Sequence, residues 1–248
     1  MNRIIPLVLV AVLSSIITPE ASSTPMEGGT VLTNATPLEG KILKSTVFLK
    51  LEGFDGGGSS NCTGVMLNQN TVATAAHCFD DPGAITAINF LSRSNRSATG
   101  YGTHLGFTYG STRDDIAKVT LGSERNARTL APTSGPVQPQ MKLVPGSAIK
   151  KGMKLIIVGA GLEIPHTKTG PCRLKYNELT VTSVGPGSFK GVISNGRICP
   201  GDSGGPAYLV GQDGNLALAG IVSSYMTAGR DAGCGGDRRL HHHRWLKL

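Results

Sequence analysis

The sequence has no long amphipathic helical pattern before its end, where residues 240–248 could form a turn or more of helix, and no evident internal repeat. Short runs rich in valine, isoleucine and threonine alternate instead with glycine-rich turns, which is typical of an antiparallel barrel or sandwich. The expected strands are residues 45–51, 64–67, 71–75, 87–91, 116–121, 155–159, 178–184, 206–210 and 216–223. We therefore expect an all-β protein with a short C-terminal helix.

Long apolar runs are also missing after the first residues, so no later segment is expected to span a membrane. The chain begins Met1-Asn2-Arg3, continues through an apolar stretch at residues 4–17 and offers small residues for cleavage at Ala21-Ser22-Ser23. This order predicts a secretory signal peptide at residues 1–23, with a membrane anchor or a disordered tail as the alternative. We expect a secreted protein, extracellular or periplasmic, without a stable membrane anchor after signal removal.

Lysine and arginine do not cluster in stripes, although 24 of them outweigh 16 acidic residues and give a formal net charge of +8 at pH 7. Such a charge favours acidic surfaces or substrates and keeps a protein soluble. Without a basic stripe, no nucleic-acid partner is expected. The consecutive histidines at residues 241–243 do not lie on one helix face, and we predict no metal and no cofactor.

The run Gly201-Asp202-Ser203-Gly204-Gly205-Pro206 indicates a serine on a tight glycine turn. Backbone N–H groups of such a turn can converge where the oxyanion of a tetrahedral intermediate needs donors. A serine hydroxyl is a poor nucleophile by itself, so this interpretation requires a histidine base and a carboxylate that orients it. The chain offers both upstream, in Thr74-Ala75-Ala76-His77-Cys78 and in Asp114-Asp115-Ile116-Ala117.

Together these three segments resemble the trypsin/chymotrypsin-like serine proteases of the secreted, bacterial type. The chain order His77, Asp115, Ser203 is that of the chymotrypsin type. Asp115 is chosen over Asp114 because Asp-Ile-Ala is the family's usual setting for the carboxylate. The resemblance covers residues 31–246 and is loose outside the motifs.

The resemblance implies a chymotrypsin-like fold of two antiparallel six-stranded β-barrels. Residues 31–135 would form the N-terminal barrel with the histidine and aspartate, and residues 136–248 the C-terminal barrel with the serine and the specificity pocket. Residues 24–30 would be a short propeptide.

The same resemblance implies a serine endopeptidase whose partner is a protein or peptide substrate. His77 would take the proton of Ser203 as the hydroxyl attacks a peptide carbonyl and would return it to the leaving amine, while Asp115 holds the imidazole. The oxyanion hole would consist of the backbone N–H groups of Gly201 and Ser203. An extended substrate would pair with the strand edge Ser223-Ser224-Tyr225.

Five cysteines are an odd number for a chain bound for an oxidising compartment. The resemblance implies disulfides between Cys62 and Cys78 and between Cys199 and Cys234. Cys172 has no partner in this scheme. A buried free thiol, an intermolecular link and a site of modification are its alternatives.

The activation signal departs from the family pattern. The family commonly buries a new N-terminal ammonium against the aspartate before the catalytic serine, here Asp202. The nearest candidate for that N-terminus is Val31, but no basic residue precedes it in residues 28–30, so no tryptic cut is encoded. Either an activating protease of another kind trims the segment, or Asp202 finds a different cation, because a buried, unpaired carboxylate would be costly.

The specificity pocket departs as well, because Arg197 stands six residues before Ser203, where trypsins carry an aspartate. If Arg197 lines the base of the pocket, cleavage after Glu, Asp or a small uncharged residue is expected in preference to Arg or Lys. The alternative is that Arg197 points to solvent or pairs with Asp231 or Asp237.

Two other functions fit part of the pattern. Residues 201–205 also match G-x-S-x-G, the nucleophile elbow of an α/β-hydrolase esterase, but that site needs a helix after the serine, where this sequence predicts a strand and a hairpin turn. A protease-fold binding protein that has lost catalysis is the second alternative. The complete set of triad residues argues against it, and labelling with a fluorophosphonate distinguishes the two.

Overall fold

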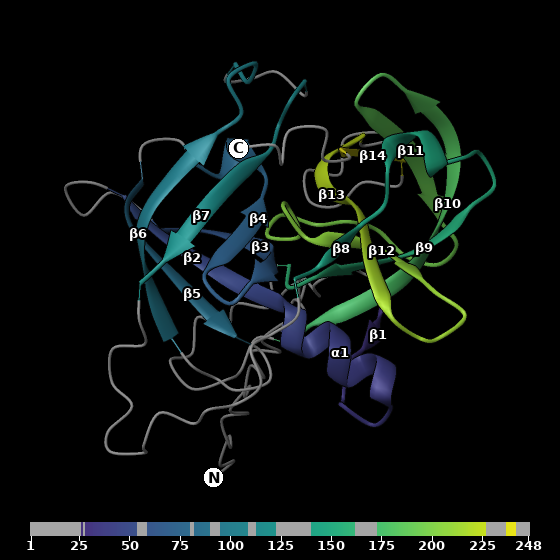
Figure 1. Ribbon diagram of the computed structural model, residues 1–248, viewed down its shortest axis with the longest axis horizontal. Coiled ribbons are helices and arrows are strands. Elements are labelled where there is room, and N and C mark those ends of the chain that lie inside the picture. Colours follow the sequence, from purple (N-terminus) through teal and green to yellow (C-terminus); the bar gives the residue numbers. More distant parts are fainter. Residues whose placement is uncertain are drawn as a thin grey trace, which may run out of the picture.

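The computed structural model describes residues 26, 28–53, 59–79, 82–89, 95–108, 113–122, 140–161, 173–226 and 237–241. Two groups of strands lie side by side, β2 to β7 and β8 to β14, and a helix, α1, lies beside both (Figure 1). The expectation of a mainly β fold is confirmed.

The first group is a closed barrel in the order β2-β3-β4-β7-β6-β5. Its strands are β2 (Thr46–Gly53), β3 (Ser59–Asn68), β4 (Thr71–Thr74), β5 (Pro82–Asn89), β6 (Asn95–Thr103) and β7 (Ala117–Leu121). Alternate residues of β7, namely Ala117, Val119 and Leu121, are buried, which is the period that a strand with one buried face requires.

The second group is an eight-stranded sheet in which β9 also pairs with β10, so that β9, β10, β11, β14, β13 and β12 follow one another around a closed ring. Its strands are β1 (Thr30–Val31), β8 (Lys142–Leu143), β9 (Lys154–Gly159), β10 (Lys175–Gly185), β11 (Ser188–Ile193), β12 (Pro206–Val210), β13 (Leu216–Met226) and β14 (Asp237–His241). A short 3-10 turn, Gly146–Ala148, precedes β9.

Helix α1 (Pro37–Ser45) contradicts the expectation that no helix precedes the C-terminus. Its start carries a reciprocal cap: the Thr36 hydroxyl accepts the N–H of Glu39, and the Glu39 carboxylate accepts the N–H of Ala35. Proline at the first helical position adds to this signal. The helix is short, so its hydrophobic periodicity is weak, and the Thr-Pro-Leu-Glu capping pattern was the available clue.

The buried apolar side chains of the described residues form two hydrophobic clusters. The larger one contains the core of the first barrel and continues into the second through Val158, Leu174, Tyr208, Leu218 and Ile221. The smaller one fills the second barrel around Leu155, Ile157, Leu179, Val181 and Phe189. Because the larger cluster includes side chains of both barrels, apolar packing holds the two together.

The strand predictions were best where apolar alternation is strong, as at residues 206–210, which coincide with β12. The expected strand at 87–91 overlaps β5 only at residues 87–89, and β6, β11 and β14 were not predicted. Strand β6 is mostly exposed and rich in glycine and polar residues, so it carries no apolar pattern. Of the expected C-terminal helix, residues 240 and 241 belong to β14, and residues 242–248 lie outside the described part.

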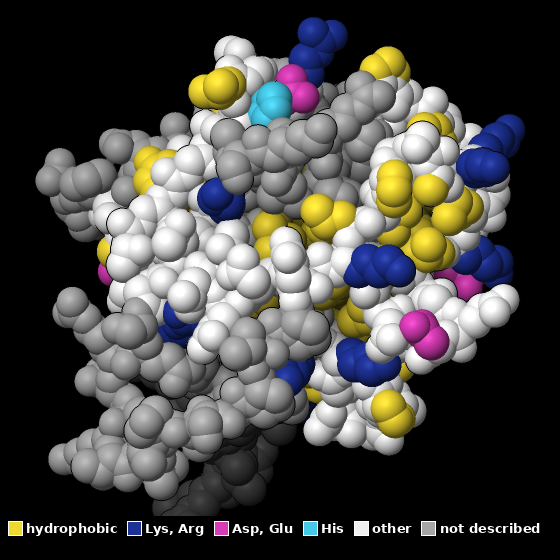
Figure 2. Space-filling model, viewed as in Figure 1, with side chains coloured by type: hydrophobic (Ala, Val, Ile, Leu, Met, Phe, Trp, Pro, Cys, Tyr) yellow, Lys and Arg dark blue, Asp and Glu magenta, His cyan; other side chains and the backbone are white. Residues whose placement is uncertain are grey.

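Lysine and arginine side chains are dispersed over the face drawn in Figure 2, whereas hydrophobic side chains gather on the side where β10 and β11 lie. Val184 of β10 and Val192 of β11 are among the large hydrophobic residues that remain exposed. No helix among the described residues is long and apolar enough to cross a membrane.

Candidate active site

His77 lies in a short 3-10 turn, Ala76–Cys78, which begins two residues after the end of β4. A disulfide between Cys78 and Cys62 of β3, with the two Cα atoms 6.4 Å apart, ties this turn to the barrel. In the chain-entropy model, a cross-link over 16 residues stabilises a fold by about 3 kcal/mol. The predicted pairing of Cys62 with Cys78 is thus confirmed, and it anchors the loop that carries the imidazole.

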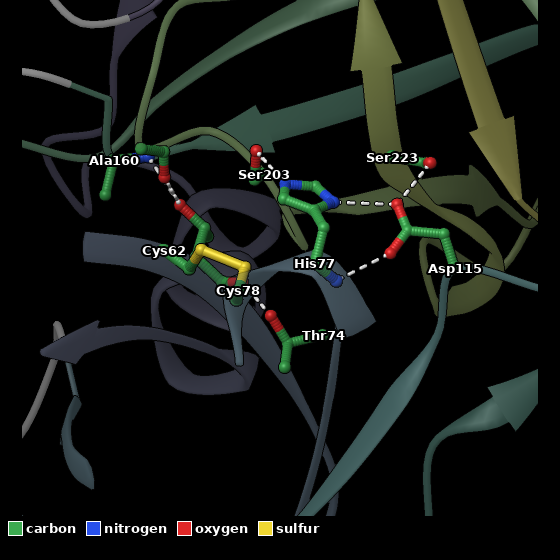
Figure 3. The surroundings of a disulfide bond; sticks show 10 residues. Cys62, Thr74, His77, Cys78, Asp115, Ala160, Ser203 and Ser223 are labelled. Atoms are coloured by element: carbon green, nitrogen blue, oxygen red, sulfur yellow. Dashed lines mark hydrogen bonds and ion pairs between the residues drawn. A yellow bond between two sulfur atoms is a disulfide. The ribbon is translucent and has the colours of Figure 1, made fainter. Parts of the chain in front are cut away.

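Asp115 lies two residues before β7 and is 1% exposed. Its Oδ1 accepts the backbone N–H of His77 at 2.8 Å, and its Oδ2 lies 2.7 Å from Nδ1 of the same residue. The hydroxyl of Ser223 donates to Oδ2 at 2.5 Å. These contacts fix the carboxylate relative to the imidazole (Figure 3).

Burial raises the pKa of Asp115 by desolvation, which is the largest single effect on it. The hydrogen bond and the charge of His77 act in the opposite direction, together with the donors of Ser223 and of the His77 backbone. Their sum outweighs burial and holds the pKa of Asp115 below its ordinary value. The carboxylate is therefore ionised at neutral pH, where it can stabilise an imidazolium.

Ser203 lies in the turn before β12, with its Oγ 2.9 Å from Nε2 of His77. The next residue, Gly204, has a φ of 77°, and a Cβ there would lie 2.0 Å from the side-chain oxygen of Thr74. Only glycine fits both conditions. The three residues predicted from the sequence thus lie in one hydrogen-bonded series, Ser203, His77 and Asp115 (Figure 3). This is the geometry of a nucleophile, a base and an orienting carboxylate.

Gly201 has a φ of 92°, a conformation in which a side chain would be strained. The backbone N–H groups of Gly201 and Ser203 donate to no acceptor among the described residues. Both are therefore available to an oxygen of a bound substrate.

Thr63 of β3 joins the first barrel to the Ser203 turn of the second, and sequence reasoning did not identify it. The residue is fully buried. Its N–H donates to the carbonyl of Ser203 and its hydroxyl to the carbonyl of Gly201, each at 2.8 Å. The same hydroxyl accepts the N–H of Ala160 at 3.0 Å. A polar residue between Cys62 and Gly64, in the interior of a strand, was the only sequence signal.

The predicted substrate-binding edge, Ser223-Ser224-Tyr225, lies in β13. Ser223 is buried and its hydroxyl is used by Asp115, so its side chain faces the triad. Ser224 is half-buried, and the side chain of Tyr225 lies outside the described part. Strand β12 pairs with β13 as far as Ile221, and the backbone N–H and carbonyl of Val222 bind Gly205 and Gly204, so the edge opposite β14 carries no strand among the described residues only beyond Val222.

Arg197 has an exposed side chain, and its carbonyl lies 4.0 Å from the sulfur of Cys199. Cys199 is disulfide-bonded, with its partner outside the described residues. Cys172 and Cys234 both lie outside that part, so the pairing of Cys199 stays a prediction. Asp231 is outside it as well, together with the side chain of Asp237.

The residues after Ser203 form β12, a strand, where the nucleophile elbow of an α/β-hydrolase would need a helix. Within the described part of the chain, no group of three or more His, Cys, Asp or Glu side chains could hold a metal ion. The arrangement at Ser203 thus favours acyl transfer to a serine on a β-barrel scaffold.

Comparisons with known proteins agree with this geometry. A family model described as Trypsin matches residues 41–241. Two relatives from Corynebacterium glutamicum, an uncharacterized peptidase (strain R) and a putative peptidase (strain ATCC 13032), are each 27% identical over 224 residues, which is 90% of this chain and 72% of each relative. A solved structure titled HL collagenase is similar in fold, with a TM-score of 0.64 and 16% identity over 88% of this chain and 93% of that one.

Proposed function

The chain belongs to the trypsin family, and from the geometry of its site we propose that it is a secreted serine endopeptidase acting through an acyl-enzyme intermediate. One observation carries the proposal: Ser203 Oγ lies 2.9 Å from Nε2 of His77, whose Nδ1 lies 2.7 Å from the carboxylate of Asp115. The two peptidase relatives support the same reaction class.

In the acylation step, Oγ of Ser203 attacks the carbonyl carbon of the scissile peptide bond while Nε2 of His77 takes the hydroxyl proton. The bond between that carbon and the amide nitrogen then breaks, and the proton passes from Nε2 to the leaving amine. Asp115 keeps Nδ1 protonated and stabilises the imidazolium formed in between. In deacylation, water takes the place of the amine, and His77 again accepts and returns one proton.

The tetrahedral intermediate places negative charge on the former carbonyl oxygen. The N–H groups of Gly201 and Ser203 are proposed as its donors, because neither donates to an acceptor among the described residues. Loss of one such donor costs roughly 3–4 kcal/mol of transition-state stabilisation in comparable enzymes. The edge of β13 after Val222, which pairs with no strand among the described residues on the side opposite β14, is proposed to bind the substrate as an added strand.

We further propose that Arg197 disfavours a basic side chain on the amino side of the scissile bond. Its exposed side chain is close in sequence to the Ser203 turn, and like charges about 4 Å apart repel by roughly 1–4 kcal/mol. Profiling on a mixed peptide library, with the Arg197→Ser variant beside the wild type, tests this. A clear preference of the wild type for Arg or Lys would show that Arg197 does not face the substrate.

Labelling with a fluorophosphonate, followed by peptide mapping, tests the reaction class. We expect a single labelled site at Ser203, loss of labelling and of peptide cleavage in Ser203→Ala, and unchanged labelling in Ser183→Ala, a control on the exposed part of β10. A folded protein without any labelling would indicate a binding protein. Hydrolysis of esters without cleavage of peptides would indicate an esterase.

A further inference from the structure

Tyr208 connects the strand that follows the nucleophile to the first barrel. It lies in β12, five residues after Ser203, and is fully buried. Its hydroxyl oxygen lies 2.8 Å from Oγ of Ser45, the last residue of α1, and 3.4 Å from Oγ1 of Thr46, the first residue of β2. Helix α1 continues directly into β2 of the first barrel, so both contacts tie the second barrel to the point where the chain enters the first (Figure 1).

The three hydroxyl groups form a directed series. A hydroxyl carries one hydrogen, and Ser45 uses its own within α1, where the carbonyls of Lys41 and Ile42 lie 2.9 and 3.2 Å from its Oγ. Tyr208 must therefore donate to Ser45, and the Thr46 hydroxyl donates to the phenol oxygen. All three residues are buried, so the loss of one leaves its neighbour without water as a replacement. One acceptor and one donor thus hold the phenol in one orientation.

The pairing of β12 with β13 directs Tyr208 toward the first barrel. The register shifts between Ala207 and Tyr208, where β13 has one extra residue, Ala219. Ala207 and Ala219 belong to the hydrophobic cluster of the second barrel. Tyr208 and its partner Leu218 belong instead to the cluster that contains the core of the first barrel. A bulge re-aims side chains in this way, and here it presents the phenol to α1.

The β12–β13 hairpin carries two groups of the active site. Ser203 lies in the turn that precedes β12, and Ser223, whose hydroxyl donates to the triad carboxylate, lies in β13. At the turn of the hairpin, Nζ of Lys41 in α1 donates to the carbonyl of Gly214 at 2.8 Å and to Oδ1 of Asn215 at 2.9 Å. Helix α1 therefore holds the hairpin at two places, one buried and one exposed.

We propose that α1 braces the β12–β13 hairpin against the first barrel, and that Tyr208 is a positioning residue for the nucleophile. Tyr208 acts through β12 and not on the substrate: by fixing the direction of the strand, it keeps Ser203 in line with His77. Thr63 binds the Ser203 turn itself, so the two residues fix different parts of one connection. The inference rests on the proposed function, because the reactivity of Ser203 is one of its measures.

The test compares Tyr208→Phe, which removes only the phenol oxygen, with Tyr176→Phe, which removes the same atom from a half-buried tyrosine of β10. Tyr208→Phe should slow fluorophosphonate labelling of Ser203 by about five- to tenfold per folded molecule, since a displacement of about 1 Å costs about a hundredfold. For peptide substrates the loss should lie in kcat, with KM within about twofold of the wild type. Tyr176→Phe should keep the labelling rate within about twofold.

A double-mutant cycle tests whether the phenol acts through α1. Ser45→Ala alone should slow labelling about as much as Tyr208→Phe. In the Ser45→Ala background, Tyr208→Phe should slow it by no more than about twofold further, because the acceptor of the phenol is already gone. Equal effects in both backgrounds, or a wild-type labelling rate in folded Tyr208→Phe, would overturn the inference and leave the proposed function intact. A merely structural tyrosine would lower the melting temperature without changing the labelling rate of folded molecules.

Amide hydrogen exchange supplies a readout that does not depend on catalysis. Tyr208→Phe and Ser45→Ala should each speed exchange in peptides that cover residues 203–210 and leave those that cover β7 unchanged. If the folded wild type were not labelled at Ser203, the proposed function would fail, and hydrogen exchange would still decide whether α1 braces the hairpin. Unchanged exchange at residues 203–210 in both variants would refute the brace.

Discussion

Substitution of Thr63 by valine tests whether the first barrel positions the nucleophile turn of the second. Valine keeps the shape of the side chain but removes the hydroxyl that donates to the carbonyl of Gly201 and accepts the N–H of Ala160. We expect the variant to fold, to be less stable, and to react more slowly with a fluorophosphonate. The backbone contact from Thr63 N–H to the carbonyl of Ser203 would remain.

The magnitudes follow from the burial of the two partners. Ala160 is fully buried, so its N–H would be left without an acceptor, at a cost of about 1–3 kcal/mol. Gly201 is partly exposed, so water can replace the lost donor to its carbonyl, and the net loss there is about 0.5–1.5 kcal/mol. The free energy of unfolding should therefore fall by about 2–4 kcal/mol. Partial loss of one oxyanion donor should lower the labelling rate by about ten- to a hundredfold.

Guanidinium unfolding measures the first quantity, and the second-order rate of labelling measures the second. Thr63→Ser is the control, because it keeps the hydroxyl and loses only a methyl group; its labelling rate should stay within about threefold of the wild type. For peptide substrates, Thr63→Val should lower kcat more than it raises KM, since the ground-state contacts of the substrate are retained. A valine variant that labels at the wild-type rate, or a serine variant as slow as valine, would refute the reasoning.

Three further predictions concern groups around the site. Ser223→Ala removes one of the donors that lower the pKa of Asp115 and orient its carboxylate, so that pKa should rise and kcat should fall by about tenfold; a folded variant with the wild-type kcat would contradict this. Loss of the disulfide in the double variant Cys62→Ala/Cys78→Ala should cost about 3 kcal/mol of unfolding free energy, measured against the wild type under oxidising conditions. Burial raises the pKa of Tyr208 to about 12 despite two hydroxyl hydrogen bonds, so the protonated form is favoured in the folded state, and about 3 kcal/mol of stability should be lost as pH rises from 10 to 12. Tyr208→Phe should abolish that alkaline loss, and an unchanged slope of unfolding free energy against pH would argue against it.

The functional residues that could be found from the sequence are those whose backbone conformation permits few residue types. Position 204 has a positive φ and no room for a Cβ atom, so it requires glycine. This requirement makes the Gly-Asp-Ser-Gly-Gly turn recognisable in the sequence. The strands with regular apolar alternation, such as β12, were found for the same reason. Helix α1 also had a local signal in its capping residues. The helix was not predicted because hydrophobic periodicity was given more weight than the capping residues.

Thr63, which sequence reasoning missed, and Ser223, which it assigned to the substrate-binding edge, both act across long sequence separations. The contact from Thr63 to Gly201 joins residues 138 positions apart, and that from Ser223 to Asp115 joins residues 108 apart. A threonine and a serine inside strands are ordinary residues in those settings, so no local pattern marks these two contacts. Their roles depend on how the barrels pack, which a single sequence does not encode in any window.

The division of the triad between two barrels assigns different tasks to apolar and polar contacts. The hydrophobic cluster that includes Tyr208 and Leu218 as well as the core of the first barrel holds the two together, but apolar burial is non-directional and tolerates small sliding movements. A nucleophile and its base need placement within about 0.5 Å, so the directional contacts of Thr63 must set the register of the interface. Trimming Leu218 should therefore lower stability by about 2–5 kcal/mol with a smaller effect on the labelling rate, whereas Thr63→Val should lower the rate well beyond what its effect on stability explains. If Leu218→Ala lowered the labelling rate of folded protein as much as Thr63→Val, apolar packing alone would position the nucleophile, and this division would be wrong.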